Sequence, residues 1–545
     1  MEKLVSAIEQ IVKSSFSVDA KLELTRPDAQ FGDYASNIAL QLAKDLGRNP
    51  REIAEDLVGK ITELPDVASA EVAGPGFINI RLHDSVLERL ADGRPSLSRQ
   101  TETVVIETNN PNPFKAMHIG HAMNAIVADT VANLLEASGA RTYRVSYHGD
   151  VGLHVGKSMY ALLRYAEGDP QKLLGVPEVG RNDFMSRMYA EGSRAYNEDE
   201  VAKGEIVELA RQSFTRQDPI YAAVYDTVFN WSFDEIDANM RRLGNKPVER
   251  RFLESEADLR GVKIVKDNVP GVFQESDGAL IFKGSEHGSF DNAFVSSSGQ
   301  GLYAARDLGL IQLKNEQYHP NKSYIVTAEE QRDYFKGVLT AAGLCFPDLK
   351  DVTINIPTGM VKLSTGKMSS RDGGIVTIAW LFDQVAEAIR ARGAEPTESV
   401  VAGALRYAFL KVRIGGDIVF DINDSVSIQG NSGPYLQYAH ARACSILEKA
   451  GDFTVMPGEY DAAERSLLRK IVEYAGVAEK AQAELLPHYI CTYLYELAQE
   501  FNRFYEHARI IGDEREAFRL ALVRRYRDTL ASGLKLLGIE ALERL

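Results

Sequence analysis

The sequence has few cysteines and no long apolar run, and each absence narrows the kind of protein that it encodes. Its 545 residues include three cysteines, which stand far apart and form no CxxC pair, as is typical of a reduced, cytosolic chain. No apolar stretch approaches the roughly 20 residues that a membrane-spanning helix needs. The opening "MEKLVSAIEQIVKSSF" has acidic residues and no small-residue cleavage site, so we expect no signal peptide. We therefore expect a cytoplasmic protein with no membrane partner.

An excess of positive charge is also missing, because the formal net charge is −15 at pH 7. This balance argues against a protein that coats nucleic acid through bulk electrostatics. It still permits a local basic surface on an acidic body. Composition alone therefore leaves a nucleic-acid partner open.

The two ends of the chain carry different patterns. Residues 1–95 combine helix-like spacing in "FGDYASNIALQLAKDLG" with strand-like alternation around a Gly-Pro-Gly turn at 74–76, which predicts an α+β domain. The polar segment "ADGRPSLSRQ" follows as a linker. Residues 381–545 have almost entirely helical periodicity, which predicts an all-α bundle.

The middle of the chain, residues 100–380, has the pattern of a parallel sheet. The strand "TVVIET", a helix over 119–138 and the strand "RTYRVSYHGD" form a strand–helix–strand unit. Short apolar strands return at 323–330 and 351–357. We therefore expect one α/β domain that is split by an insertion at roughly 160–265.

The stretch "NPNPFKAMHIGHAMN" marks the start of the long helix. His118 and His121 lie three residues apart, so their rings fall on nearly one face of the first turn. The unsatisfied N–H groups and the positive dipole end of a helix favour an anion there, and Gly120 leaves room for a flat ligand. We interpret this as a nucleotide site whose imidazoles donate to phosphate oxygens. Two alternatives stay open: a zinc site, which would need a third ligand, and two ordinary histidines without a ligand.

A second constellation, "STGKMSSRDGG" at 364–374, combines hydroxyls, glycines and the two cations Lys367 and Arg371. A loop so rich in donors is suited to closing over a polyphosphate. The alternative is an ordinary solvated surface loop.

Together, "HIGH" and the lysine-Met-Ser-Ser loop resemble the paired signatures of class I aminoacyl-tRNA synthetases, where they lie on two halves of a Rossmann-like domain and meet over ATP. Nucleotidyltransferases of the same superfamily share the first motif. "DAQFGDYASNIAL" with "EVAGPGFINIRL" resembles the N-terminal additional domain of arginyl-tRNA synthetases. "SDGALIF", "LYAARDLGLI", "GNSGPYLQYAHARACSIL" and "LKLLGIEALERL" resemble later blocks of that family, so the resemblance covers nearly the whole chain.

The resemblance implies a multidomain fold: an N-terminal α+β additional domain, a Rossmann-like catalytic domain with an insertion, and a C-terminal all-α anticodon-binding bundle. It implies ATP-dependent ligation of L-arginine to the 3′-terminal adenosine of tRNA(Arg) through an arginyl-adenylate. The partners would be tRNA(Arg), L-arginine and ATP with Mg²⁺, and the protein would be a monomer without a protein-ligated metal.

The resemblance assigns catalysis and ATP binding to the two motifs and to one further block. Catalytic roles fall to His118, His121, Lys115, Lys367 and Arg371, and ATP binding falls to Gly120, Met368, Ser369, Gly149 and Asp150 together with the two histidines. Ser370 stands where the usual loop signature has a lysine, and arginyl enzymes with this loss have a lysine just ahead of the histidine motif. We therefore predict that Lys115 supplies the missing cation at the triphosphate.

Arginine recognition needs a carboxylate and planar acceptors in a dry pocket. Tyr303 and Asp307 stand at i and i+4, one above the other on a helix face, and the family's arginine pocket uses a tyrosine and an aspartate at this spacing. The alternatives are a packed aromatic for Tyr303 and a surface ion pair for Asp307. By resemblance, Asn112 holds the polar end of the amino acid and Gln331 also contacts it. Tyr334 stands where the family usually has a histidine.

For tRNA, the resemblance points to Phe31 and Asn37 as contacts with the tRNA elbow, and to Tyr438 and Tyr493 as base-stacking platforms. Both tyrosines could equally be core aromatics. Two other functions remain as alternatives to a synthetase. One is a free-standing adenylyltransferase, which would not need the helical domain, and the other is a catalytically dead tRNA-binding module, against which the intact His118, His121 and Lys367 argue.

Overall fold

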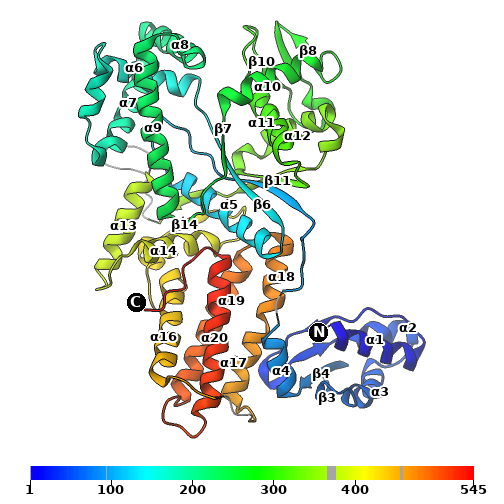
Figure 1. The fold of residues 1–545 in the computed structure, drawn as a ribbon. Helices are drawn as coiled ribbons and strands as arrows, with labels where there is room; N and C mark the ends of the chain where they lie inside the picture. Colours follow the sequence, from blue (N-terminus) through cyan, green and yellow to red (C-terminus); the bar gives the residue numbers. More distant parts are fainter. Residues whose placement is uncertain (1, 94, 365–375, 455–457, 545) are drawn as a thin grey trace.

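The computed structural model describes residues 2–93, 95–364, 376–454 and 458–544 (Figure 1). At the N-terminal end, helices pack on an antiparallel sheet with the strand order β1-β2-β4-β3. Its elements are α1 (Glu2–Phe16), β1 (Leu24–Thr25), η1 (Ala29–Phe31), β2 (Tyr34–Ser36), α2 (Ile38–Leu46), α3 (Pro50–Thr62), β3 (Val67–Ala73), β4 (Phe77–Leu82) and α4 (Asp84–Ala91). Alternate residues of β4, namely Ile78, Ile80 and Leu82, are buried, which confirms the α+β pattern expected here.

A five-stranded parallel sheet forms the centre, with the strand order β12-β11-β5-β6-β7. The strands are β5 (Thr103–Asn109), β6 (Arg141–His148), β7 (Arg250–Leu253), β11 (Lys322–Ala328) and β12 (Thr353–Thr358). Helix α5 (Ile119–Ala137) connects β5 to β6, as the sequence predicted. The chain runs from β5 through β6 to β7 at one edge of the sheet. It then returns to β11, on the other side of β5, and reaches β12 at the opposite edge. Ligands of open α/β sheets bind at the carboxyl ends of the strands beside such a reversal.

The helical insertion lies between β6 and β7 and ends earlier than we expected. It comprises α6 (Leu153–Ala166), η2 (Pro170–Gly175), η3 (Glu178–Gly180), α7 (Arg181–Glu198), α8 (Glu200–Thr215) and α9 (Pro219–Arg242). β7 falls inside the predicted insertion range, yet it pairs in parallel with β6 and belongs to the sheet. With the sequence "RRFL", this strand is too short and too charged to stand out as an apolar run.

The second half of the central domain surrounds the carboxyl ends of the strands. After β7 come α10 (Glu254–Asp267), a small antiparallel sheet of β8 (Phe273–Ser276), β9 (Ala279–Phe282) and β10 (Asn292–Val295) with η4 (Gly284–His287), and α11 (Tyr303–Tyr318). Past β11 follow η5 (Glu329–Gln331), α12 (Arg332–Cys345), η6 (Pro347–Leu349) and, after β12, β13 (Val361–Leu363). β13 pairs in parallel with β14 (Ile418–Phe420), a short strand inside the segment for which we expected an all-α bundle.

The C-terminal part is otherwise helical and stands beneath the central sheet in Figure 1. Its helices are α13 (Ile378–Arg390), α14 (Glu398–Leu410), α15 (Ile422–Ser425), α16 (Gly433–Ala450), α17 (Ala462–Val472), α18 (Tyr474–Glu484), α19 (His488–His507) and α20 (Glu516–Leu536). Among the helices that the structure describes, we find none that is long and apolar enough to span a membrane.

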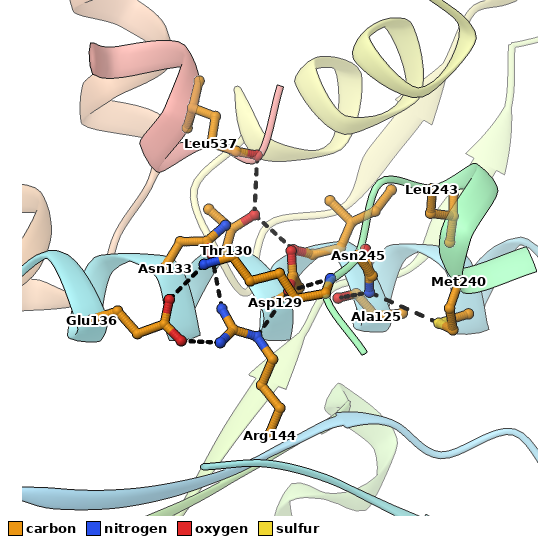
Figure 2. A network of polar contacts seen from close by, with 12 residues as sticks. Ala125, Asp129, Thr130, Asn133, Glu136, Arg144, Met240, Leu243, Asn245 and Leu537 are labelled. Carbon is orange, nitrogen blue, oxygen red and sulfur yellow. Dashed lines mark hydrogen bonds and ion pairs between the residues drawn. The ribbon is translucent and has the colours of Figure 1, made fainter. Parts of the chain in front are cut away.

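A buried polar network joins this bundle to α5. Arg406 of α14 donates to the carboxylate of Asp129 at 2.8 Å, to Asn245 Oδ1 at 2.8 Å and to the carbonyl of Leu537 at 2.9 Å. Arg144 of β6 donates to the other oxygen of Asp129 at 3.1 Å, and Figure 2 shows these groups converging from several segments. The network therefore fixes α5 against both the sheet and the end of the last helix.

The N-terminal domain is attached to the bundle by ion pairs. Asp33 is fully buried, and its two carboxylate oxygens accept from Arg465 of α17 at 2.8 and 2.9 Å. Arg469 lies 2.9 Å from Asp33 and donates to the carbonyl of Gly32 at 2.8 Å. These contacts explain why the N-terminal domain lies beside α17 in Figure 1.

Candidate functional site

A cavity of about 820 Å³ opens where the strand order reverses. Every strand of the central sheet contributes a residue at or just beyond its carboxyl end: Asn109 for β5, Tyr147 for β6, Glu254 for β7, Thr327 for β11 and Gly359 for β12. The sheet therefore offers one concave site at the place where its topology predicts a ligand.

His118 and His121 line this cavity at the start of α5, with their ring centroids 3.7 Å apart. The backbone N–H of His118 donates to His121 Nδ1 at 3.2 Å, so the ring hydrogen of a neutral His121 lies on Nε2. Burial, with a smaller effect from the charge of Lys115, lowers the pKa of His118 to about 4. Burial also lowers the pKa of His121 well below its usual value. Both rings are therefore neutral hydrogen-bond donors at neutral pH.

Hydrogen bonds from the sheet and from the segment before α13 hold the loop ahead of α5. His148, fully buried at the end of β6, donates from Nδ1 to the carbonyl of Pro111 at 2.6 Å, and its Nε2 accepts from Ser146 at 2.8 Å. On the other side, the N–H of Ile119 donates to the carbonyl of Val376 at 3.0 Å. His148 thus supports the site from behind, because it does not line the cavity.

Phe114, in the same loop, has a left-handed backbone with φ of 68°, which costs a residue with a bulky side chain about 1–2 kcal/mol. The helical insertion holds it in this conformation. Ser158 of α6 donates to the carbonyl of Phe114 at 2.8 Å, and the Phe114 N–H donates to Ser232 Oγ of α9 at 3.0 Å. The insertion therefore sets the path of the chain directly before Lys115.

Lys115 is half-buried close to the two histidines. It does not line the cavity, but its charge contributes to the lowered pKa values of His118 and His121. Burial lowers the pKa of the Lys115 ammonium, and nearby Glu254 opposes that effect. Lys115 forms no ion pair with any residue that the structure describes. An ammonium in this position can serve an incoming anion.

At the other side of the cavity, Asp307 is a carboxylate without a cationic partner among the described residues. The two neighbouring glutamates each have a cationic partner: Glu107 pairs with Lys314 at 2.6 Å, and Glu254 pairs with Arg306 at 2.8 Å. Burial raises the pKa of Asp307 to about 7, although Tyr334 donates a hydrogen bond that favours the ionised form. A carboxylate held in this way is suited to a cationic ligand.

The structure brings all four predicted amino-acid contacts to this same cavity. Tyr303 is 63% exposed and lines it beside Asp307, so neither of the alternatives considered for this pair applies. Gln331 lines it from η5. Asn112 lines it as well, and its Oδ1 accepts from the Gly149 N–H at 3.0 Å. Gly120 and Gly149, expected at the nucleotide, also border the cavity.

Asp150 does not reach the cavity, contrary to our expectation for an ATP contact. Its buried carboxylate accepts from the N–H of Ser255 at 2.9 Å and from its hydroxyl at 2.7 Å, which ties it to the first turn of α10. The predicted loop residues Lys367, Met368, Ser369 and Arg371 lie outside the described residues. Leu363 and Val376, on either side of that loop, both line the cavity.

Three of the four predicted tRNA contacts are exposed. Phe31 is 49% exposed and Tyr438 is 44% exposed, and Asn37 is also at the surface. Tyr493 was a wrong prediction as a stacking platform, because it is only 3% exposed and its hydroxyl donates to the carbonyl of Lys470 at 3.0 Å. Its ring belongs to the core of the bundle.

Glu254 and Tyr147 are among the cavity residues that the sequence reasoning missed. Both have a signal that could have found them, since each stands at or next to the carboxyl end of a strand. Glu254 was not identified as a site residue because β7, the strand directly before it, was assigned to the insertion. Tyr147 lies inside "RTYRVSYHGD", where the strand was identified and a role was assigned to Gly149 and Asp150 but none to Tyr147.

Family models match along the chain. Residues 2–82 match "Arginyl tRNA synthetase N terminal domain", residues 85–415 match "tRNA synthetases class I (R), catalytic domain", and residues 436–545 match "DALR anticodon binding domain". The arginine–tRNA ligase of Pseudoalteromonas atlantica is 32% identical over 556 residues, with 94% of each chain covered. That of Vibrio vulnificus is 29% identical over 584 residues, with 100% of this chain and 99% of the relative covered.

A solved structure has the same overall fold. Thermus thermophilus arginyl-tRNA synthetase superposes with a TM-score of 0.80 at 24% identity, and the match covers 100% of both chains. At this identity the likeness supports the fold alone. It supports the order of an N-terminal domain, a parallel-sheet domain and a helical C-terminal domain.

Proposed function

The chain belongs to the arginyl-tRNA synthetase family, which charges tRNA(Arg) with arginine, and on that premise we propose that both chemical steps take place in the cavity between His118 and Asp307. The observation that carries this proposal is the state of Asp307, a half-buried carboxylate whose acidic neighbours already have cations. A guanidinium supplies both the charge and the planar donors that Asp307 needs.

In the first step, the α-carboxylate of arginine attacks the α-phosphorus of ATP and pyrophosphate leaves. We assign the guanidinium to Asp307 and Tyr303, and the polar end of the amino acid to Asn112 and Gln331. The protein then contributes orientation and stabilisation of the growing phosphate charge.

The phosphates would lie at the start of α5. His121 is neutral and carries its hydrogen on Nε2, so it donates to a phosphate oxygen without a proton having to be taken up first. We assign Lys115 to the triphosphate, together with Lys367 and Arg371 of the loop. Mg²⁺ would arrive with ATP, held by the phosphate oxygens. In the second step, the 2′-hydroxyl of the terminal adenosine attacks the arginyl-adenylate carbonyl and releases AMP.

We propose that the tRNA binds along three domains, which comprise approximately residues 1–95, 100–380 and 381–545. Phe31 and Asn37 would contact the elbow of the tRNA, and Tyr438 would stack on an anticodon base. We further propose that the protein acts as a monomer in the cytoplasm.

Arginine-dependent exchange between ATP and labelled pyrophosphate tests the proposal, run with and without tRNA(Arg). We expect exchange with arginine when tRNA is present, and none with citrulline, whose neutral urea cannot form an ion pair with Asp307. Equal exchange with citrulline would contradict the role of Asp307. If tRNA binds and no exchange occurs under either condition, the chain is a tRNA-binding module instead.

A further inference from the structure

Tyr147 lines the cavity, and its hydroxyl is buried with no hydrogen-bond partner among the residues that the structure describes. The residue is next to last in β6, and its N–H donates to Asn110 Oδ1 at 3.0 Å. Its ring packs on the buried cluster of Val105, Val145, Phe252, Ala257 and Leu310. The backbone and the ring are therefore fixed, and the hydroxyl cannot turn away to the solvent.

A hydroxyl in this state is unfavourable for the ligand-free protein. Leaving a buried polar group without a partner costs about 1–3 kcal/mol, and most buried hydroxyls in folded proteins have a partner. Tyrosine and phenylalanine differ by this one oxygen, so packing alone does not require tyrosine here. The position is better explained by a group that binds in the cavity.

The surroundings of Tyr147 indicate the charge of that group. Burial raises the pKa of Tyr147 well above its usual value, and the charges of Asp307, Glu254 and Glu107 add to the effect while Arg306 opposes it. The phenol is therefore neutral, and it lies in a predominantly acidic part of the cavity. A cationic group with N–H donors is the ligand that complements it.

Asp307 cannot accept hydrogen bonds from all the N–H donors of a guanidinium. A guanidinium has five N–H donors, and Asp307 already uses part of its acceptor capacity on the hydroxyl of Tyr334. Glu254 is similarly engaged by Arg306. A guanidinium bound at Asp307 therefore has N–H donors left for a further acceptor.

We propose that Tyr147 is a specificity-determining residue whose Oη accepts a hydrogen bond from the guanidinium of the arginine substrate beside Asp307. This inference rests on the function proposed for the cavity and adds a further neutral contact for the guanidinium to those assigned to Asp307 and Tyr303. The Tyr147 hydroxyl is held by a rigid strand, so it favours a ligand whose donors lie in one plane. It therefore disfavours lysine, whose ammonium is a compact point charge.

The test is Tyr147→Phe, with Tyr143→Phe as the matched control. Tyr143 lies on the same strand and packs on the same cluster, but it does not line the cavity. In pyrophosphate exchange with tRNA(Arg) present, we expect Y147F to raise the arginine KM by about tenfold to a hundredfold, the loss associated with one hydrogen bond to a charged group. The ATP KM should change by less than about twofold, and Y143F should leave both values unchanged.

Thermal unfolding without arginine separates substrate contact from a structural role. Y147F should unfold at the same temperature as the parent protein or higher, because it removes an unpartnered buried hydroxyl. A lower midpoint, an unchanged arginine KM, or an equal rise in the ATP KM would overturn the inference. Failure of the proposed function is distinguishable, since the parent protein itself would then show no arginine-dependent exchange.

Discussion

Arg406 of α14 and Asp129 of α5 form an ion pair at 2.8 Å across 277 residues of sequence, with side chains 0% and 1% exposed. The same α5 begins with the two histidines of the cavity, so the pair connects the helical bundle to the helix that presents them. A buried pair of this kind is costly to break, because removal of Arg406 leaves one oxygen of the buried Asp129 carboxylate without its cationic donor.

Replacement of Arg406 by methionine should therefore destabilise the protein strongly. It removes the donors to Asp129, Asn245 and the Leu537 carbonyl, and we expect the free energy of unfolding to fall by about 3–5 kcal/mol. Urea denaturation measures this loss. Arg544→Met is the control, since Arg544 forms an exposed pair with Glu448 that should contribute less than about 1 kcal/mol. Equal effects of the two substitutions would contradict the role of the network.

The affinity for arginine should depend on pH through Asp307. Burial raises its pKa to about 7, so the carboxyl is increasingly protonated below that pH and ionised above it. Because the guanidinium binds the ionised form, the arginine KM should rise as pH falls through about 7, by up to about tenfold per unit, and level off above about pH 8. Pyrophosphate exchange at several pH values measures this profile.

Asp307→Asn provides the matching variant for the pH profile. The amide keeps the shape of the carboxylate but cannot ionise, so the arginine KM should be high at every pH and should lose its dependence near pH 7. Glu107 and Glu254, the other acids that face Asp307, are paired with Lys314 and Arg306. A pH profile that stays the same in the D307N variant would assign the titration to another group.

Lys115→Ala should lower the rate of arginine activation while the arginine KM stays nearly constant. The ammonium lies near the histidines and forms no ion pair in the part of the chain that the structure describes, so its removal leaves developing phosphate charge less compensated. We expect a loss of about a hundredfold in kcat, with partial recovery in Lys115→Arg. Lys203→Ala, an exposed lysine of α8, should have no effect. An activation rate that K115A leaves intact would rule out this role.

Tyr438→Ala should weaken binding of tRNA(Arg) without a change in the arginine KM. The ring is 44% exposed on α16, and loss of one stacked base costs about 1–3 kcal/mol, so the tRNA KM should rise about fivefold to a hundredfold. Aminoacylation at varied tRNA concentration measures the change. Tyr165→Ala, an exposed tyrosine of α6, is the control. A tRNA KM equal to that of the control would exclude the stacking contact.

Local patterns predicted much of the fold and one half of the site. The periodicity after Gly120 predicted α5, and the spacing of Tyr303 and Asp307, together with the family resemblance, selected two residues that do line the same cavity. These predictions succeeded because each depends on residues within one or two helical turns. The apolar strands β11 and β12 were confirmed for the same reason.

The remaining features depend on contacts between distant parts of the chain. The hydrogen bond from Tyr334 to Asp307 arises only once distant elements meet, so no local pattern could predict it. The same holds for the Tyr147 hydroxyl, which has no hydrogen-bond partner within the described part of the chain. Tyr493 is different, because a signal was present. It lies four residues before Leu497 and three after Ile490, both buried on the same stripe of α19, which marks an inward-facing position.

The N-terminal domain is held to the helical bundle by side chains as well as by the peptide chain. Side chains of the bundle hold this domain at several points. Asp33 and Asp84 both bind Arg465. Further along the chain, Glu88 accepts from Tyr460, and Asp92 pairs with Arg525. The peptide link between α4 and β5 is thus not the sole connection. A chain cleaved there would remain assembled, and the first domain supplied as a separate polypeptide would find its place on α17 through the same arginines.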